Sequence, residues 1–204
     1  NHPEIIIYKV DNKEYKKSDI YTDKMYIYKP INGMGSHGIK VIKGSEVKGI
    51  LEKEDNFIIQ EKIKDCLINE GSRVFRLCTL YDGTPFTLRE NINIKDDIVN
   101  NSRYKETTSE LCEYNRCNRL SKDEYKKLEV TINKLCELHK NRYSDVFNIG
   151  WDLMINCDNK YNIDIYVLEG NVCGSCWLYN NTYKDGIEID YKDRYKRFIK
   201  KIFK

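Results

Sequence analysis

The chain has 204 residues, of which 40% are hydrophobic and 33% are charged, and its formal net charge is +3. This length suffices for one well-buried domain or two small lobes, and the balance is that of an ordinary globular protein. So small a charge gives no reason to expect nucleic acid as a partner, and no run of 18 apolar residues is present that would span a membrane.

The first part of the chain is rich in β-branched and aromatic residues, which favour strands. We expect strands over residues 4–10, 25–31, 39–44 and 56–63, and one short helix over residues 45–53.

The segment "YKPINGMGSHGI" lies between the second and third of these strands. It places Gly33, Gly35 and Gly38 within six residues, shortly after Lys29. Glycines let backbone N–H groups approach an anion closely, and a lysine beside them adds a positive charge for a phosphate. By itself the segment is either a glycine-rich turn or a phosphate-binding loop.

Two further strands are expected over residues 72–80 and 84–94, joined by the turn signal Tyr81-Asp82-Gly83. Arg73 and Arg76 lie on the first of them. Their spacing of three places them on opposite faces of a regular strand, so only one is expected to face a site.

Residues 95–118 are polar, and we expect a loop there that helps to select a substrate. The clearest helix follows over residues 121–143, where Ser121 and Glu124 form a capping box. His139 lies on its apolar stripe, so we expect a packed, hydrogen-bonded histidine and not a catalytic one.

Two late strands, residues 148–155 and 163–172, are expected to form a hairpin through the polar turn "NCDNKYN". Glu169 and Asn171 alternate on one strand and share a face, and Asp152 lies on the neighbouring strand about 5 Å away. Their oxygen atoms suit Mg²⁺. Taken alone, such residues are either a metal site or ordinary solvated side chains at strand ends.

The chain ends in a helix whose apolar face carries Tyr191, Tyr195, Phe198 and Ile202, with a basic face that we expect to be solvated. The order of elements predicts an α+β fold of two lobes without βαβ alternation. Residues 1–66 would form the first lobe and residues 67–204 the second.

Taken in order, these segments resemble the ATP-grasp superfamily over roughly residues 24–178. The positions that carry the resemblance are "YKPINGMGSHGI", "IIQEKI", "FRLCTL", "IGWD" and "LEGN". The last two look most like the ATP-grasp group associated with sugar transfer, and a tubulin-tyrosine-ligase-like relative is next nearest. The resemblance implies two lobes, each with a mainly antiparallel sheet and helices, and a nucleotide cleft between them.

The resemblance also implies roles for individual residues. ATP would be bound by Lys29, by the glycine loop (Gly33, Gly35, Ser36, His37 and Gly38) and by a hinge that lines adenine and ribose (Gln60, Glu61 and Ile63). Arg76, with Arg73 as the alternative, would act with Lys29 in catalysis by stabilising the transferred phosphoryl group. Mg²⁺ would be held by Asp152, Glu169 and Asn171.

The implied reaction activates a carboxylate as an acyl phosphate, which an amine or another nucleophile attacks. The acceptor, a carboxylate or a sugar-containing molecule, is not readable from the residues. The alternatives are a kinase that phosphorylates a hydroxyl group and a nucleotide-binding or assembly module without turnover.

The sequence departs from the family in four ways, one of which is a long hairpin between the two metal strands. The α/β domain that usually precedes the lobes is absent or was removed, and because the first residue is Asn, the chain could be a fragment. A second upstream lysine has only Lys9 and Lys24 as candidates. Gly174-Ser175 stands where relatives often carry a proline-glycine turn.

The composition favours a cytoplasmic protein. The eight cysteines are expected to be reduced thiols in place of a disulfide framework, because a chain of this size needs no staples. Abundant Lys, Asn, Ile and Tyr, with no Ala, are typical of a very AT-rich genome, such as that of a large DNA virus or a protist.

Overall fold

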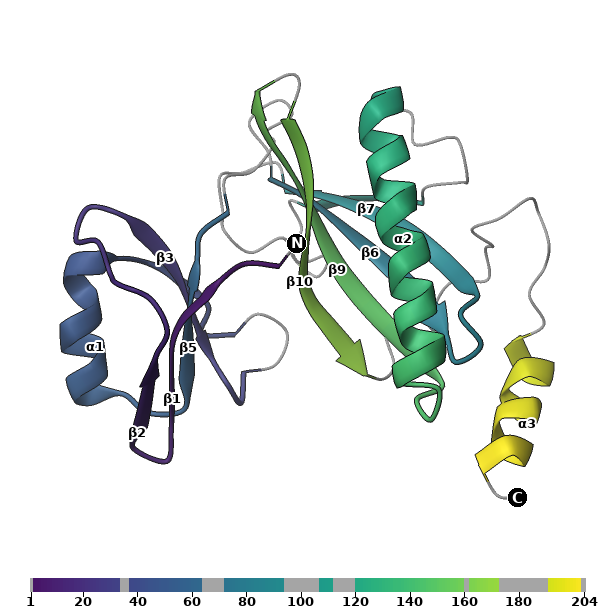
Figure 1. Ribbon diagram of the computed structural model, residues 1–204, viewed down its shortest axis with the longest axis horizontal. Coiled ribbons are helices and arrows are strands. Elements are labelled where there is room, and N and C mark those ends of the chain that lie inside the picture. The colour runs from purple at the N-terminus through teal and green to yellow at the C-terminus, as the bar shows by residue number, and fades with distance from the viewer. Residues whose placement is uncertain are drawn as a thin grey trace.

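The fold is α+β and is built on two five-stranded sheets (Figure 1). The computed structural model describes residues 2–33, 37–63, 72–93, 107–111, 120–159, 162–172 and 191–202. Every strand pair in both sheets is antiparallel. The two sheets lie side by side in Figure 1, with α1 against the first and α2 across the second.

The first sheet has the strand order β2-β1-β5-β3-β4. Its elements are β1 (Ile5–Val10), β2 (Lys13–Lys16), β3 (Met25–Pro30), β4 (Lys40–Lys43) and β5 (Phe57–Glu61), with the short helices η1 (Gly44–Glu46) and α1 (Val47–Lys53). The four predicted strands and the helix are confirmed. The strand β2 was not predicted; it follows a two-residue turn, Asp11-Asn12, with φ of 49° and 60°.

The second sheet has the strand order β10-β9-β6-β7-β8. Its strands are β6 (Ser72–Leu80), β7 (Pro85–Asn93), β8 (Thr107–Leu111), β9 (Asn148–Asn159) and β10 (Asn162–Val172). The expectation of a loop throughout residues 95–118 is wrong at β8, which pairs with β7. The predicted seven-residue hairpin turn is also wrong, because β9 and β10 continue pairing as far as Asn159 and Asn162.

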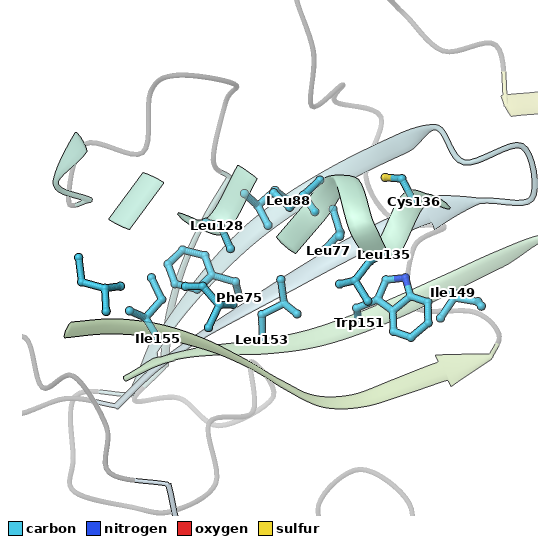
Figure 2. Packing of buried hydrophobic residues seen from close by; sticks show 13 residues of the cluster. Phe75, Leu77, Leu88, Leu128, Leu135, Cys136, Ile149, Trp151, Leu153 and Ile155 are labelled. Carbon is cyan, nitrogen blue, oxygen red and sulfur yellow. The ribbon is translucent and has the colours of Figure 1, made fainter. Parts of the chain in front are cut away.

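Helix α2 (Lys122–Arg142) packs on the second sheet, and the larger hydrophobic core lies between the helix and the sheet. The capping box is confirmed: Glu124 N donates to Ser121 Oγ at 3.2 Å, and Ser121 N donates to Glu124 Oε2 at 2.7 Å. Figure 2 shows the core side chains, among them Leu128 and Leu135 of the helix against Phe75 and Leu153 of the sheet. Burying this apolar stripe is what holds the helix to the sheet.

Helix α3 (Tyr191–Ile202) packs at the turn between β6 and β7. The ring centroid of Phe198 lies 5.2 Å from that of Tyr81 and 5.3 Å from that of Phe147. Arg194 forms an ion pair with Asp82. The predicted apolar face therefore packs through Phe198, whereas Ile202 is exposed. None of the three α-helices in the described part of the chain has the length and apolar character that a membrane crossing requires.

Two cysteine side chains are described, and they differ in state. Cys136 is a free, buried thiol. Cys78 is disulfide-bonded, so the expectation of reduced thiols throughout is wrong at this residue. Burial raises the pKa of the Cys136 thiol to about 12, and the charges of Asp82 and Glu137 add to the effect, which leaves this thiol protonated.

His139 is fully buried and hydrogen-bonded, as the apolar stripe predicted. Its Nε2 lies 2.9 Å from Val146 O and its Nδ1 lies 2.7 Å from Thr79 Oγ1. Trp151 Nε1 donates to the same Thr79 oxygen at 2.8 Å. The contacts form one consistent chain if Nε2–H donates to Val146 and the Thr79 hydroxyl donates to Nδ1, so the imidazole is neutral.

Acidification is expected to weaken the fold through His139. Burial lowers the pKa of His139, although its bond to Val146 and the charges of Asp82 and Asp145 oppose this. A lowered pKa in the folded state means that the stabilisation is complete above the unfolded value, about 6.5, and is lost as the pH falls. The free energy of unfolding in urea should decrease from about pH 7 to about pH 5, and less steeply for His139→Gln. Equal slopes for both proteins would contradict this.

Candidate functional site

Arg76 and Asp152 meet across two neighbouring strands of the second sheet. They are register partners in β6 and β9, and their side chains are 25% and 13% exposed. Arg76 Nε forms an ion pair with Asp152 Oδ1, and Arg76 Nη2 donates to Asp152 Oδ2 at 2.7 Å. This bidentate geometry holds both side chains in one orientation. The Arg73 side chain lies outside the described residues, so the choice of Arg76 over Arg73 as the residue that faces a site stays a prediction.

Glu169 and Asn171 lie on β10, next to Asp152. A β-bulge between Val167 and Glu169 brings Glu169 into register with Asp152, and Asn171 into register with Gly150. Asn171 Nδ2 donates to Glu169 Oε1 at 2.9 Å. The three predicted metal residues therefore lie together on one face of the sheet, and α2 packs on the other.

The two carboxyl groups of this site titrate differently. Burial raises the pKa of Asp152 to about 7; the Arg76 charge opposes this, and a hydrogen bond with Glu169 adds to it. Burial also acts to raise the pKa of Glu169, but hydrogen bonds from Asn171 and Asp152 and the charges of Lys29 and Arg76 outweigh it, so the pKa is lowered. Near pH 7 the pair therefore holds up to one proton between two carboxyl groups.

This donor set fits a small divalent cation. Two carboxyl groups that share a proton offer a place where a cation can replace that proton. The described residues contain no group of three His, Cys, Asp or Glu side chains placed to hold one metal ion, so Asn171 would have to supply a third ligand. Turning its amide over presents Oδ1 in place of Nδ2, and an amide oxygen is a ligand that Mg²⁺ accepts.

Lys29 brings a positive charge from the first sheet to these carboxylates. It lies near the end of β3 and is half-buried. Burial lowers its pKa, while the negative charges of Glu169 and Asp152 act to raise it. The same Lys29 charge contributes to lowering the pKa of Glu169. Lys29 thus shares one electrostatic environment with carboxylates that lie 123 and 140 positions later in the sequence.

The glycine segment is described at Gly33, His37 and Gly38, whereas Gly35 and Ser36 lie outside the described residues. Gly33 N donates to Pro30 O at 3.2 Å. Gly38 has a φ of +80°, which L-residues with a side chain rarely adopt, and a Cβ there would lie 2.9 Å from Pro30 Cγ. Gly38 is therefore required by the backbone of the turn. The role of the segment in binding a phosphate stays a prediction.

The expected hinge residues lie at the end of β5, the central strand of the first sheet: Gln60 and Glu61 are its last two residues, and Ile63 comes just after it. Gln60 and Ile63 are buried, and Glu61 is exposed. Gln60 is the register partner of Ile27 on β3, two residues from Lys29. These residues are thus close to the Lys29 strand, but their contact with a base or ribose stays a prediction.

Lys9, one of the two candidates for a second upstream lysine, is bound to the end of α1. Its ammonium donates to Leu51 O at 2.7 Å and to Glu54 O at 2.8 Å, where it closes the carboxyl end of α1. Lys24 lies 4.5 Å from the centroid of the Tyr21 ring. The proposed substrate-selecting segment lies outside the described residues except for β8.

Sequence reasoning missed one feature of this site. Trp151 precedes Asp152 and lies against Gly170, the residue between Glu169 and Asn171. The available signal was the glycine itself, because a glycine inside a strand often marks a close approach by another group.

Comparison with known proteins places the fold. No family model and no curated protein matches this chain. D-cycloserine synthetase DcsG superimposes with a TM-score of 0.53 at 13% identity, over 89% of this chain and 56% of that one. D-alanine–D-alanine ligase from Bacillus anthracis gives 0.50 at 15% identity, over 84% and 50%. The chain spans about half the length of both. At this identity the likeness shows the fold alone, which this chain shares with those two proteins.

Proposed function

We propose that this chain is an ATP- and Mg²⁺-dependent ligase domain. It activates a carboxylate as an acyl phosphate, which an amine or another nucleophile attacks to give a ligated product, ADP and phosphate. The observation that carries the proposal is the register pairing of Glu169 with Asp152 on one face of the second sheet, with the charge of Lys29 acting on both from the first sheet. A cation facing paired acidic groups is what a metal-bound triphosphate needs from two lobes. Two solved structures of this fold are named as a ligase and a synthetase, which supports the reaction class.

The residues of the chain would divide the work as follows. Lys29 neutralises α- and β-phosphate oxygens, and the backbone of the segment 33–38 covers the terminal phosphates. Arg76 stabilises the charge of the transferred phosphoryl group, for which its pairing with Asp152 orients it in advance. Gln60, Glu61 and Ile63 line the base and the ribose. Because positioning and charge neutralisation carry this reaction, no side-chain nucleophile is required.

Asp152, Glu169 and Asn171 would hold Mg²⁺, which when bound neutralises phosphate charge and orients the triphosphate. In this proposal the acceptor is a molecule that is modified in the synthesis of a glycan or a peptide-like polymer. The chain would then be a relative of the ATP-grasp group associated with sugar transfer.

Calorimetry with Mg²⁺–ATP tests the proposal directly. We expect binding by the full chain, and at least about tenfold weaker binding by Lys29→Met, since a half-buried charge facing phosphate is removed. Lys43→Met, which removes an exposed lysine of β4, is the matched control and should bind as the wild type does. No binding at millimolar nucleotide would refute the proposal and favour an assembly module without nucleotide.

Product analysis separates the ligase from a kinase. A ligase releases ADP and phosphate only when a carboxylate and an acceptor are both present. A stable phosphorylated product formed on a hydroxyl group would refute the ligase and support the kinase.

Binding of Mg²⁺ is expected to strengthen as the pH rises through about 7. Below this pH the raised pKa of Asp152 keeps a proton on the acidic pair, and the cation must displace it. The affinity should then change by up to about tenfold per pH unit on the acidic side. Calorimetry in two buffers of different ionisation enthalpy counts the released proton. An affinity that does not change with pH, without proton release, would contradict the assignment of Asp152.

A further inference from the structure

A neighbouring side chain fills the space that a side chain at residue 170 would need. Gly170 is the register partner of Trp151, and a Cβ built on it would lie 2.8 Å from Trp151 Cζ3 and 3.0 Å from Trp151 Cε3. The indole ring therefore covers the face of β10 on which residue 170 would carry a side chain. The residues on either side, Glu169 and Asn171, project to the opposite face, where Asp152 lies.

The Trp151 ring is held and cannot easily give way. It is 7% exposed and belongs to the core beneath α2, where Figure 2 shows it beside Leu135 and Ile149. Its Nε1 donates to Thr79 Oγ1 at 2.8 Å, and the Thr79 hydroxyl is in turn bonded to His139 at 2.7 Å. Thr79 and His139 are both fully buried. A shift of the ring would break this chain of buried hydrogen bonds, which is costly.

The strand β10 is the more compliant partner. It is the edge strand of its sheet, so in the described part of the chain only β9 pairs with it. Glu169 and Gly170 are exposed, and the bulge that begins just before them interrupts regular pairing. A side chain added at residue 170 would therefore displace β10, and with it Glu169 and Asn171, relative to Asp152.

We propose that Trp151 is a positioning residue for the cation ligands. The indole is held by its hydrogen bond to Thr79, which is bonded in turn to His139. It fixes how close β10 can come to the core at Gly170, and thereby the distances of Glu169 and Asn171 from Asp152. This inference rests on the proposed function, since it assumes that these three side chains hold a divalent cation. Trp151 touches neither cation nor nucleotide and acts only through the strand.

The test is Mn²⁺ binding to the nucleotide-free full chain, measured by calorimetry or by the Mn²⁺ electron paramagnetic resonance signal. Gly170→Val should weaken the affinity about tenfold or more, the scale on which outer-shell changes weaken metal sites. Trp151→Leu should weaken it as well, because the ring no longer supports the strand. The double variant should bind more tightly than either single variant, since valine at residue 170 fills space that the ring has left.

Controls separate positioning from folding. Gly49→Ala adds a methyl group at a helical glycine with nothing within 4 Å, and it should bind Mn²⁺ as the wild type does. The milder Gly170→Ala keeps the test valid if Gly170→Val does not fold, as judged by circular dichroism. Wild-type affinity in a folded Gly170 variant, or no recovery in the double variant, would overturn the inference alone. Absence of Mn²⁺ binding by the wild-type chain would refute the cation site itself and this inference with it.

Discussion

Replacing Glu169 or Asn171 with alanine is expected to abolish Mg²⁺-dependent ATP binding while the chain stays folded. Both side chains lie near the end of an edge strand, on the face of the sheet that points away from α2, so neither supports the core. Each is nevertheless a proposed ligand beside Asp152. The loss of one ligand from a set of three should weaken Mg²⁺–ATP binding by about 100-fold or more, which corresponds to about 2.7 kcal/mol.

The measurement is calorimetry with ATP in the presence and absence of Mg²⁺, together with urea unfolding of each variant. The matched control is Asp164→Ala, which removes an exposed carboxylate from the same strand. It should leave the affinity within about twofold of the wild type. Unchanged ATP affinity in both the Glu169 and the Asn171 variants would refute the metal assignment, and the site would have to be sought elsewhere.

Replacing Arg76 with methionine is expected to reduce turnover by about 10³-fold, the effect of removing an arginine that stabilises a transferred phosphoryl group. The reduction should appear in kcat more than in KM, because this charge acts on the transition state. Arg73→Met is the comparison on the same strand, and its effect should be far smaller, since the spacing of three predicts that Arg73 faces the other way. An equal loss in both variants would contradict the assignment of Arg76.

Folding must be monitored separately in the Arg76 variant. Arg76 neutralises the half-buried Asp152, so its removal raises the pKa of Asp152 further and favours the protonated acid. Arg76→Lys retains a charge near Asp152 but loses the two-point contact. If positioning matters, Arg76→Lys should keep the stability in urea better than its turnover. Full activity in Arg76→Lys would show that charge alone is sufficient.

Local signals in the sequence determined most of the elements. The capping box at Ser121 begins α2 because both of its hydrogen bonds lie within one helical turn. The enrichment in β-branched and aromatic residues likewise predicted the strand that carries Lys29. His139 could be placed in the core because its spacing from Leu128 and Leu135 follows the helical repeat. These features depend on neighbours within a few residues, so they can be read from the chain.

The tertiary structure decided how these elements meet. The bulge after Val167 turns Glu169 to the face of Asp152; in uninterrupted register it would pair with Trp151 and face α2. No local pattern reveals this, because a bulge depends on the partner strand. The ion pair of Arg76 with Asp152 and the charge of Lys29 beside Glu169 likewise depend on strand order and on the packing of two sheets. The candidate site residues could therefore be identified from the sequence. The distances between their side chains follow only from long-range register and packing.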